Sequence, residues 1–162
     1  MKIPARWFPR ILFACLVALP LAGTCRAQSS HSDMDKSISN MVGDPAQFQT
    51  VFTGLKQAVE KHDAAAVAAL ISYPITINPR TKKAISIRTP KTFIARYDQI
   101  VTPHIADVIE KQKYEDLFVN DQGAMFGSGE VWIAGICKDK ACKQVDIKVR
   151  TIQNTIVPPK SK

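Results

Sequence analysis

The sequence predicts an α+β domain in which helices pack on one face of a curved antiparallel sheet. Two observations carry this prediction. In the first part of the chain, apolar residues recur every three or four positions, as in helices that face a core. From residue 116 onward they alternate with polar residues, as in strands with one buried and one wet face. Helical segments followed by a run of strands are typical of this fold class.

Residues 1–27 have the features of a secretory signal peptide. Basic residues and no acid occupy positions 1–10, and the apolar run 11–22 follows. This run is too short to cross a bilayer as a stable helix, which needs about 20 residues. We therefore expect no transmembrane span in the mature protein, cleavage after Ala27, and a periplasmic or secreted product that starts at Gln28.

Two alternatives to a cleaved, soluble product stay open. The stretch Leu-Ala-Gly-Thr-Cys at 21–25 resembles a lipoprotein signal, in which Cys25 would carry the lipid. The match is imperfect because Thr24 stands where that pattern has a small residue directly before the cysteine. The same apolar run also fits a membrane anchor or a buried helix.

The charge of the chain argues against a nucleic-acid partner. Loss of the signal peptide removes four basic residues and lowers the formal net charge from +8 to +4. The tightest basic cluster comprises Arg80, Lys82, Lys83 and Arg88, which fall in a predicted loop and edge strand. Nucleic-acid-binding domains usually present a more strongly clustered basic face.

Two cysteines remain after the signal peptide, and they predict a disulfide. Cys137 and Cys142 lie five positions apart near the ends of two predicted strands, and an even pair in an exported protein is typical of a disulfide. The alternatives are two free thiols or half of a zinc site. Because the three histidines of the chain show no ligand-like spacing, we expect no metal and no other cofactor.

The predicted elements follow in order along the chain. Residues 28–43 are polar and serine-rich, which predicts a flexible lead-in to a single domain over 44–157. Asp44-Pro45 predicts the start of a first helix, Asp63 a second short helical piece, and Thr89-Pro90 a further helix that restarts at Pro103 and ends near Lys113. Residues 158–162 are a polar tail.

The predicted strands fall into two groups. Residues 73–78 and 84–88 are short β-branched runs joined by a turn. Residues 117–126, 130–138 and 144–153 predict three antiparallel strands. Gly127-Ser128-Gly129 supplies the first turn between them, and the segment closed by the two cysteines supplies the second.

Two segments of the chain resemble a known superfamily. LKQAVEKHDAAAVAALISYPITIN, in the first helical region, resembles the opening of the nuclear transport factor two-like (SnoaL-like) superfamily, and FVNDQGAMFGSGEVWIAGIC resembles the sheet hairpin of its secreted bacterial members. His62 stands where that superfamily commonly has glycine. The resemblance covers roughly residues 48–154 and implies a cone-like, cystatin-like roll. It implies no particular function, because these folds host enzymes and binding modules alike.

A shorter resemblance concerns the segment between the two cysteines. Cys-Lys-Asp-Lys-Ala-Cys at 137–142 is similar to the disulfide-closed loop with which periplasmic inhibitors of vertebrate lysozyme plug the enzyme's cleft. In that family the loop reads Cys-Lys-Pro-His-Asp-Cys, so Asp139 and Lys140 replace proline and the cleft-probing histidine. The resemblance implies a candidate binding loop. Its members are Lys138, Asp139, Lys140 and Ala141.

Five residues form a candidate pocket: Tyr97, Asp98, His104, Glu130 and Trp132. Catalytic cone folds place a base and a polar partner inside a dry cavity. We expect Tyr97 to face the core, Asp98 to be exposed to solvent, and His104 to have a structural role at the start of a helix. Alternation places Glu130 and Trp132 on one face of a strand, and we favour the outer face, where Glu130 is a surface acid.

These observations favour a binding or interaction protein over an enzyme. No nucleophile–base motif, glycine-rich phosphate loop or metal cluster is present in the sequence. We expect a partner in the cell envelope, in particular a cell-wall-degrading enzyme that the protein inhibits or confers immunity against, or else a small-molecule ligand. The alternatives are a small isomerase or dehydratase with Asp98, His104 or Glu130 as base, and an envelope scaffold.

Overall fold

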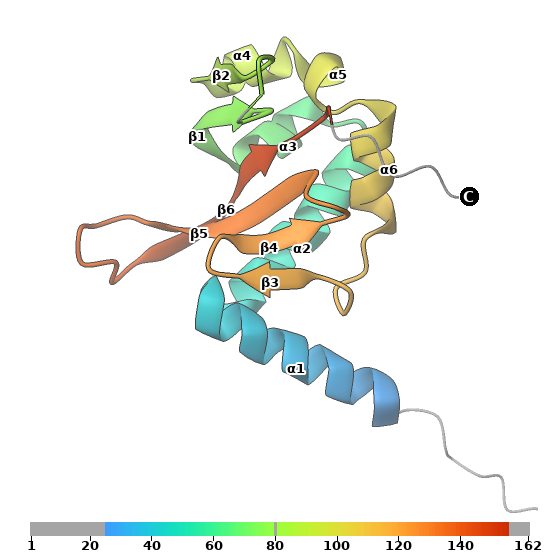
Figure 1. The fold of residues 1–162 in the computed structure, drawn as a ribbon, viewed down its shortest axis with the longest axis vertical. Helices are drawn as coiled ribbons and strands as arrows, with labels where there is room; N and C mark the ends of the chain where they lie inside the picture. The colour runs from blue at the N-terminus through green and yellow to red at the C-terminus, as the bar shows by residue number, and fades with distance from the viewer. Residues whose placement is uncertain (1–24, 80, 156–162) are drawn as a thin grey trace, which may run out of the picture.

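The computed structural model describes residues 25–79 and 81–155, so the predicted signal peptide up to residue 24 and the predicted tail from Pro158 lie outside them. Within these residues the chain forms helices on one face of a curved, open sheet, which confirms the predicted α+β class (Figure 1). The helices are α1 (Cys25–Met41), α2 (Pro45–Glu60), α3 (Ala64–Ala69), α4 (Pro90–Ile94), α5 (Tyr97–Ile100) and α6 (Pro103–Lys111). The strands are β1 (Ile71–Ile77), β2 (Ile85–Ile87), β3 (Phe118–Asn120), β4 (Gly123–Phe126), β5 (Val131–Cys137) and β6 (Val145–Ile152).

Helices α2, α3, α4 and α6 begin where the capping residues predict. The carboxylate of Asp44 accepts a hydrogen bond from the backbone N–H of Gln47 at 2.7 Å, which caps α2. Asp63 caps α3 in the same way, through the backbone N–H groups of Ala65 and Ala66. The predicted helix from residue 89 is divided into three shorter ones, α4, α5 and α6, because the chain leaves helical geometry at the joints between them.

The main difference from the sequence prediction is α1, which replaces the flexible lead-in predicted for residues 28–43. Ile38 on this helix is fully buried. The carboxylate of Asp35 accepts a hydrogen bond from the phenol of Tyr114 at 2.7 Å, and α1 packs against α2 and β3. The prediction of a flexible lead-in is wrong because it depends on the serine content of the segment and not on its apolar residues. Met34, Ile38 and Val42 recur at steps of four and form an apolar stripe that packs on the core.

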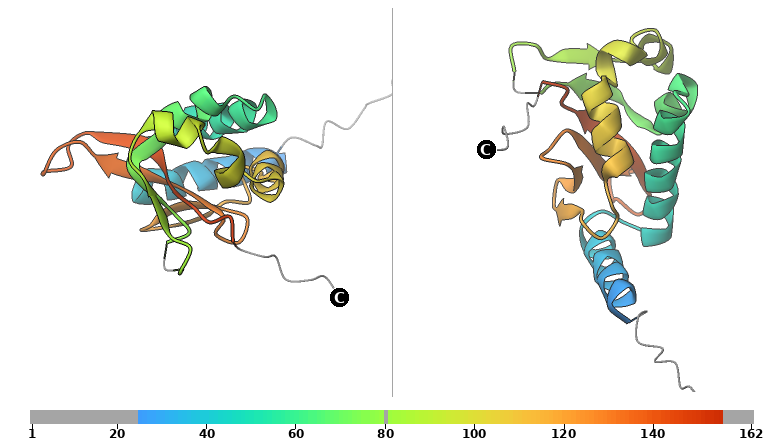
Figure 2. Two further views of the ribbon diagram at one scale, coloured as in Figure 1. Left: turned by 90° about the horizontal axis from the view of Figure 1, so that it is seen from above. Right: turned by 90° about the vertical axis from the view of Figure 1, so that its right-hand side faces the viewer.

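The sheet has the strand order β2-β1-β6-β5-β4-β3. All neighbours are antiparallel except β1 and β6, which run parallel. Their register shifts between Ile71 and Thr76, a stretch that contains Pro74, whose nitrogen has no hydrogen to donate to the ladder. Figure 2 shows the helices gathered on one face of this sheet.

The strand predicted over residues 117–126 is two strands. β3 and β4 form a tight hairpin around Asp121 and Gln122. The side chain of Asn120 accepts a hydrogen bond from the backbone N–H of Gln122 at 2.8 Å, and Gly123 adopts a φ of +125°. The stretch Asn-Asp-Gln-Gly at 120–123 is rich in residues that favour turns, so the local sequence overrides the alternation that predicts one strand.

The core lies between the helices and the sheet and is rich in aromatic rings. The Phe52 ring lies 5.3 Å from that of Phe126 and 5.6 Å from that of Tyr114, between ring centroids. Phe48 and Phe126 are fully buried. These rings join α2, the segment after α6, and β4, and they hold the elements that carry the candidate sites in place.

Candidate functional site

The predicted disulfide is confirmed. Cys137 and Cys142 are bonded, with their Cα atoms 4.7 Å apart. The bond closes the turn between β5 and β6, whose tip extends away from the rest of the sheet (Figure 1). Residues 138–141, called the disulfide loop below, are all exposed.

Hydrogen bonds within the hairpin tip make the disulfide loop rigid. The carboxylate of Asp139 accepts from the backbone N–H groups of Ala141, Lys143 and Gln144, at 2.9, 3.2 and 3.3 Å. Lys138 pairs with Asp146 at 2.9 Å. Asp139 is therefore turned toward its own backbone, whereas the ammonium groups of Lys140 and Lys143 pair with no acid among the described residues.

His104 and Glu130, two of the five candidate pocket residues, are brought together. Nε2 of His104 lies 3.2 Å from Oε1 of Glu130. The other oxygen of Glu130 accepts a hydrogen bond from the backbone N–H of Ser128 at 2.5 Å. The imidazole is one-third exposed and the carboxylate is 2% exposed, so this is a buried carboxylate paired with a half-buried histidine.

The burial of Glu130 corrects the expectation that it is a surface acid on the outer face. Glu130 precedes the first residue of β5, in the turn that follows β4, so strand alternation does not determine which way it points. The turn directs the carboxylate of Glu130 toward His104 and the backbone N–H of Ser128. A Cβ atom placed on Gly127 would lie 2.5 Å from Oε2 of Glu130, so a glycine is needed there to leave room for the carboxylate.

Tyr97 and Asp98 belong to a separate cluster. As expected, Tyr97 is buried and Asp98 is exposed. Asp98 pairs with Nε2 of His62 at 3.0 Å, and the His62 ring meets the Tyr97 ring edge-on at 4.9 Å. The phenol oxygen of Tyr97 is buried and finds no hydrogen-bond partner among the described residues. Burial raises its pKa, and the nearby carboxylates, Asp98 first, raise the pKa further.

His62 has a left-handed backbone geometry. Its φ of 54° lies in the left-handed region, directly after the C-terminal end of α2. Helices commonly end in this conformation.

Trp132 lies apart from the other four candidates. Its half-buried indole lines a small polar depression on the sheet with a volume of about 270 Å³. The other residues that line this depression are Pro79, Gln122, Arg150, Thr151 and Gln153.

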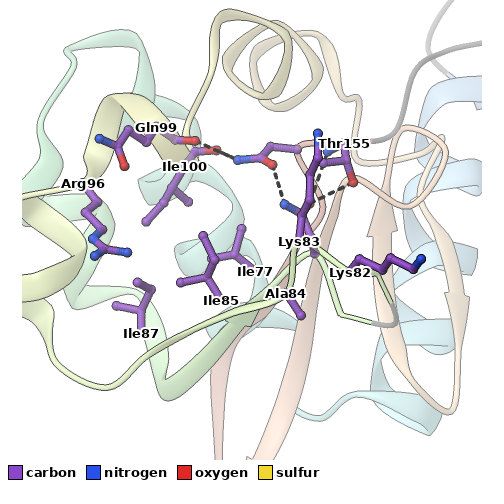
Figure 3. Close-up of a pocket in the computed structure, with 12 residues that line it drawn as sticks. Ile77, Lys82, Lys83, Ala84, Ile85, Ile87, Arg96, Gln99, Ile100 and Thr155 are labelled. Carbon is purple, nitrogen blue, oxygen red and sulfur yellow. Dashed lines mark hydrogen bonds between the residues drawn. The ribbon is translucent and has the colours of Figure 1, made fainter.

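A larger pocket, which the sequence analysis does not predict, lies at the β2 edge of the sheet. It has a volume of about 520 Å³, within the range of small-molecule sites. It is surrounded by strands β1 and β2, the loop before β2, α5, and residues Asn154 and Thr155 directly after β6 (Figure 3). It is called the β2–α5 pocket below. Its lining residues are Ile77, Asn78, Lys82, Lys83, Ala84, Ile85, Ile87, Arg96, Gln99, Ile100, Asn154 and Thr155.

Asn78 holds the walls of the β2–α5 pocket together. It is 4% exposed and has a φ of 52°. Its side-chain N–H donates to Asn154 Oδ1 at 2.7 Å, and its side-chain oxygen accepts from Thr155. The side-chain N–H of Asn154 in turn donates to the carbonyl oxygens of Gln99 and Ile100. The end of β1, the segment after β6 and α5 are therefore linked by one hydrogen-bonded network.

Sequence reasoning missed this pocket because its residues come from three separate stretches, 77–87, 96–100 and 154–155. The sequence places the basic residues Lys82 and Lys83 in a predicted loop, and no local pattern indicates that they border a pocket. A usable signal is the left-handed Asn78 at the end of a β-branched run, since asparagine is one of the few residues that adopt this geometry readily.

The described residues contain no group of three or more histidine, cysteine, aspartate or glutamate side chains that could hold a metal ion. Within the same part of the chain, every helix is too short or too polar to span a membrane.

Comparison with protein-family models, with curated proteins and with solved structures gives no match to this chain. The interpretation of its sites therefore depends on their geometry.

Proposed function

We propose that this chain is an exported binding protein that holds a small, largely apolar ligand in the β2–α5 pocket. The observation that carries the proposal is the pocket itself, whose 520 Å³ is enough for a small molecule and whose lining includes four isoleucines. Three of these, Ile77, Ile87 and Ile100, are at most 4% exposed, and Ile85 is 44% exposed. A ligand that covers Ile85 removes apolar surface from water, which favours binding.

Binding fits the lining of this pocket better than catalysis does. The lining residues that the structure describes include no carboxylate and no imidazole, which are the groups that most often act as general bases. The one histidine–carboxylate pair among the candidate residues, His104 with Glu130, lies outside the lining.

Export is part of the proposal. The basic start and apolar run of residues 1–22 support it, and the Cys137–Cys142 disulfide is typical of oxidising compartments. Mass spectrometry of the native protein tests this point. We expect a chain that lacks Met1, and an intact Met1 would contradict export with cleavage.

The test of the binding function fills the pocket. Ala84 lines it and is exposed, so Ala84→Trp adds an indole to the pocket without entering the core. Ala141→Trp adds the same group to the disulfide loop and is the matched control. We screen small molecules of several chemical classes by the rise in melting temperature that ligands cause. Stabilisation that is lost only in Ala84→Trp supports the proposal; no binder in any class, or equal binding by both variants, contradicts it.

A second candidate function is supported by the disulfide loop. A rigid, exposed loop loses little conformational entropy on binding. Lys140 and Lys143, whose ammonium groups pair with no acid among the described residues, favour an acidic partner. We propose as the partner a cell-wall-degrading enzyme that the loop would inhibit. Capture of lysozyme-like and amidase enzymes is compared between the wild type, Lys140→Glu and Cys137→Ser. Undiminished capture by both variants would remove the loop from consideration.

A further inference from the structure

We propose that the ligand of the β2–α5 pocket is an amphipathic carboxylate, with its anionic head at Arg96 and its apolar tail on the isoleucines. This rests on the proposed binding function of that pocket and specifies the chemical class of the ligand. Four features of the pocket carry the inference: its charge, the direction of Arg96, the state of its polar groups, and its apolar wall.

The charged side chains of the pocket are basic among the residues that the structure describes. Lys82, Lys83 and Arg96 are among these lining residues, and no described aspartate or glutamate is. None of these three side chains forms an ion pair or a hydrogen bond with another described residue, although acids elsewhere on the surface pair readily, as Asp98 does with His62. An anion in the pocket would therefore meet cations whose partners it does not have to displace.

Arg96 is the cation that is placed to hold the head. Figure 3 shows its guanidinium directed toward Ile87, whereas the side chain of Lys82 runs away from the isoleucines. A guanidinium presents a planar fork of donors that matches the two oxygens of a carboxylate. One such fork complements a head with a single charge.

The other polar groups of the pocket are largely committed. The side chain of Asn78 donates to that of Asn154, which in turn donates to the carbonyl oxygens of two residues of α5. The hydroxyl of Thr155 donates to Asn78. A neutral ligand with many hydroxyl or amide groups would have to break this network to be recognised. Among the described lining residues, the side chains that offer free donors are Arg96, the two lysines and Gln99.

The apolar wall selects the rest of the ligand. Four isoleucines from β1, β2 and α5 line the pocket, with Ile77 and Ile85 side by side at its centre and Ile87 on the side of Arg96 (Figure 3). The fourth is Ile100. A strongly hydrated inorganic anion gains nothing from these side chains, whereas an alkyl or aryl group does. A cationic head above them would be repelled by Arg96. The two requirements together favour an amphipathic anion, and the single planar fork of Arg96 favours a carboxylate as its head.

The test compares three ligands that share one tail and differ in the head. Decanoate, decanol and decylamine are titrated calorimetrically, below the concentrations at which they aggregate, into wild type, Arg96→Gln and Arg88→Gln. Arg88 is exposed and lies outside the pocket lining, so Arg88→Gln removes the same charge nearby and is the matched control.

We expect decanoate to bind wild type about tenfold more tightly than decanol, a charge-assisted hydrogen-bond contribution of ordinary size, and decylamine to bind least. Arg96→Gln should remove this preference, and Arg88→Gln should keep it. If decanol binds as tightly as decanoate, or if both variants lose the preference equally, the carboxylate class is wrong and the pocket remains a binding site. If none of the three ligands binds, and the broader screen finds no ligand for the pocket, the binding function itself fails.

Discussion

Replacement of Ile38 by alanine tests whether α1 belongs to the folded domain. Ile38 is 0% exposed in the structure and belongs to the hydrophobic core. Three buried carbons at about 0.8 kcal/mol each set a lower bound of about 2.4 kcal/mol. The cavity left behind raises the expected loss in free energy of unfolding to about 3–4 kcal/mol.

The assay is urea unfolding of the chain from Gln28 onward, followed by circular dichroism. Met41→Ala is the matched control, because Met41 lies at the end of the same helix and is 55% exposed. We expect it to change the free energy of unfolding by less than about 0.5 kcal/mol. If Ile38→Ala is as mild as Met41→Ala, α1 is not docked on the core, and the reasoning that makes it part of the domain is refuted.

The remaining predictions concern alkaline pH, a buried acid and the disulfide. Burial raises the pKa of all three tyrosines above the ordinary value of 10.0, that of Tyr73 to about 12. Above pH 10.0 the folded state therefore holds phenol protons that the unfolded state releases. The free energy of unfolding is intact below pH 10.0 and falls as the pH rises above it. Phenolate absorbance should stay flat through this pH in the native protein and rise only with unfolding, and a normal titration of any tyrosine in the folded state would contradict its burial. Glu130→Ala should lower the free energy of unfolding in urea by about 3 kcal/mol, because it leaves the Ser128 N–H and His104 without their partner. Asp98→Ala, which breaks an exposed ion pair, should lower it by less than about 1 kcal/mol. Equal losses would mean that the carboxylate of Glu130 is not buried. Replacement of both Cys137 and Cys142 by serine opens a short loop and should lower the free energy of unfolding by about 2 kcal/mol. Ligand binding in the β2–α5 pocket should be unchanged, because no residue of the hairpin tip lines that pocket. Weakened ligand binding would show that the two regions are coupled.

Local signals predict the parts of this fold that local interactions determine. Asp44 and Asp63 cap helices because their side chains satisfy backbone N–H groups two or three residues further on. The disulfide follows from two cysteines that flank a turn. Each of these features depends on residues within a few positions of one another, so the sequence contains all the information needed.

Features that depend on distant partners are the ones that sequence reasoning misses. Helix α1 is stabilised by Tyr114, 79 positions from Asp35 in the chain, and Glu130 is buried because its turn folds back toward His104 at the start of α6. The β2–α5 pocket exists only once the segment around Asn154 reaches Asn78. Propensity and alternation contain no term for such contacts, so they misplace these residues or do not find them.

Mapping of the decanoate site by nuclear magnetic resonance tests the central claim most directly. We expect amide shifts that saturate with added decanoate and cluster at Ile85, Arg96, Ile100 and Thr155, with the hairpin tip at residues 138–143 unmoved. Shifts centred on the hairpin tip or on the depression beside Trp132, or no saturable shift at all, would contradict the claim that this pocket is where the protein binds its ligand.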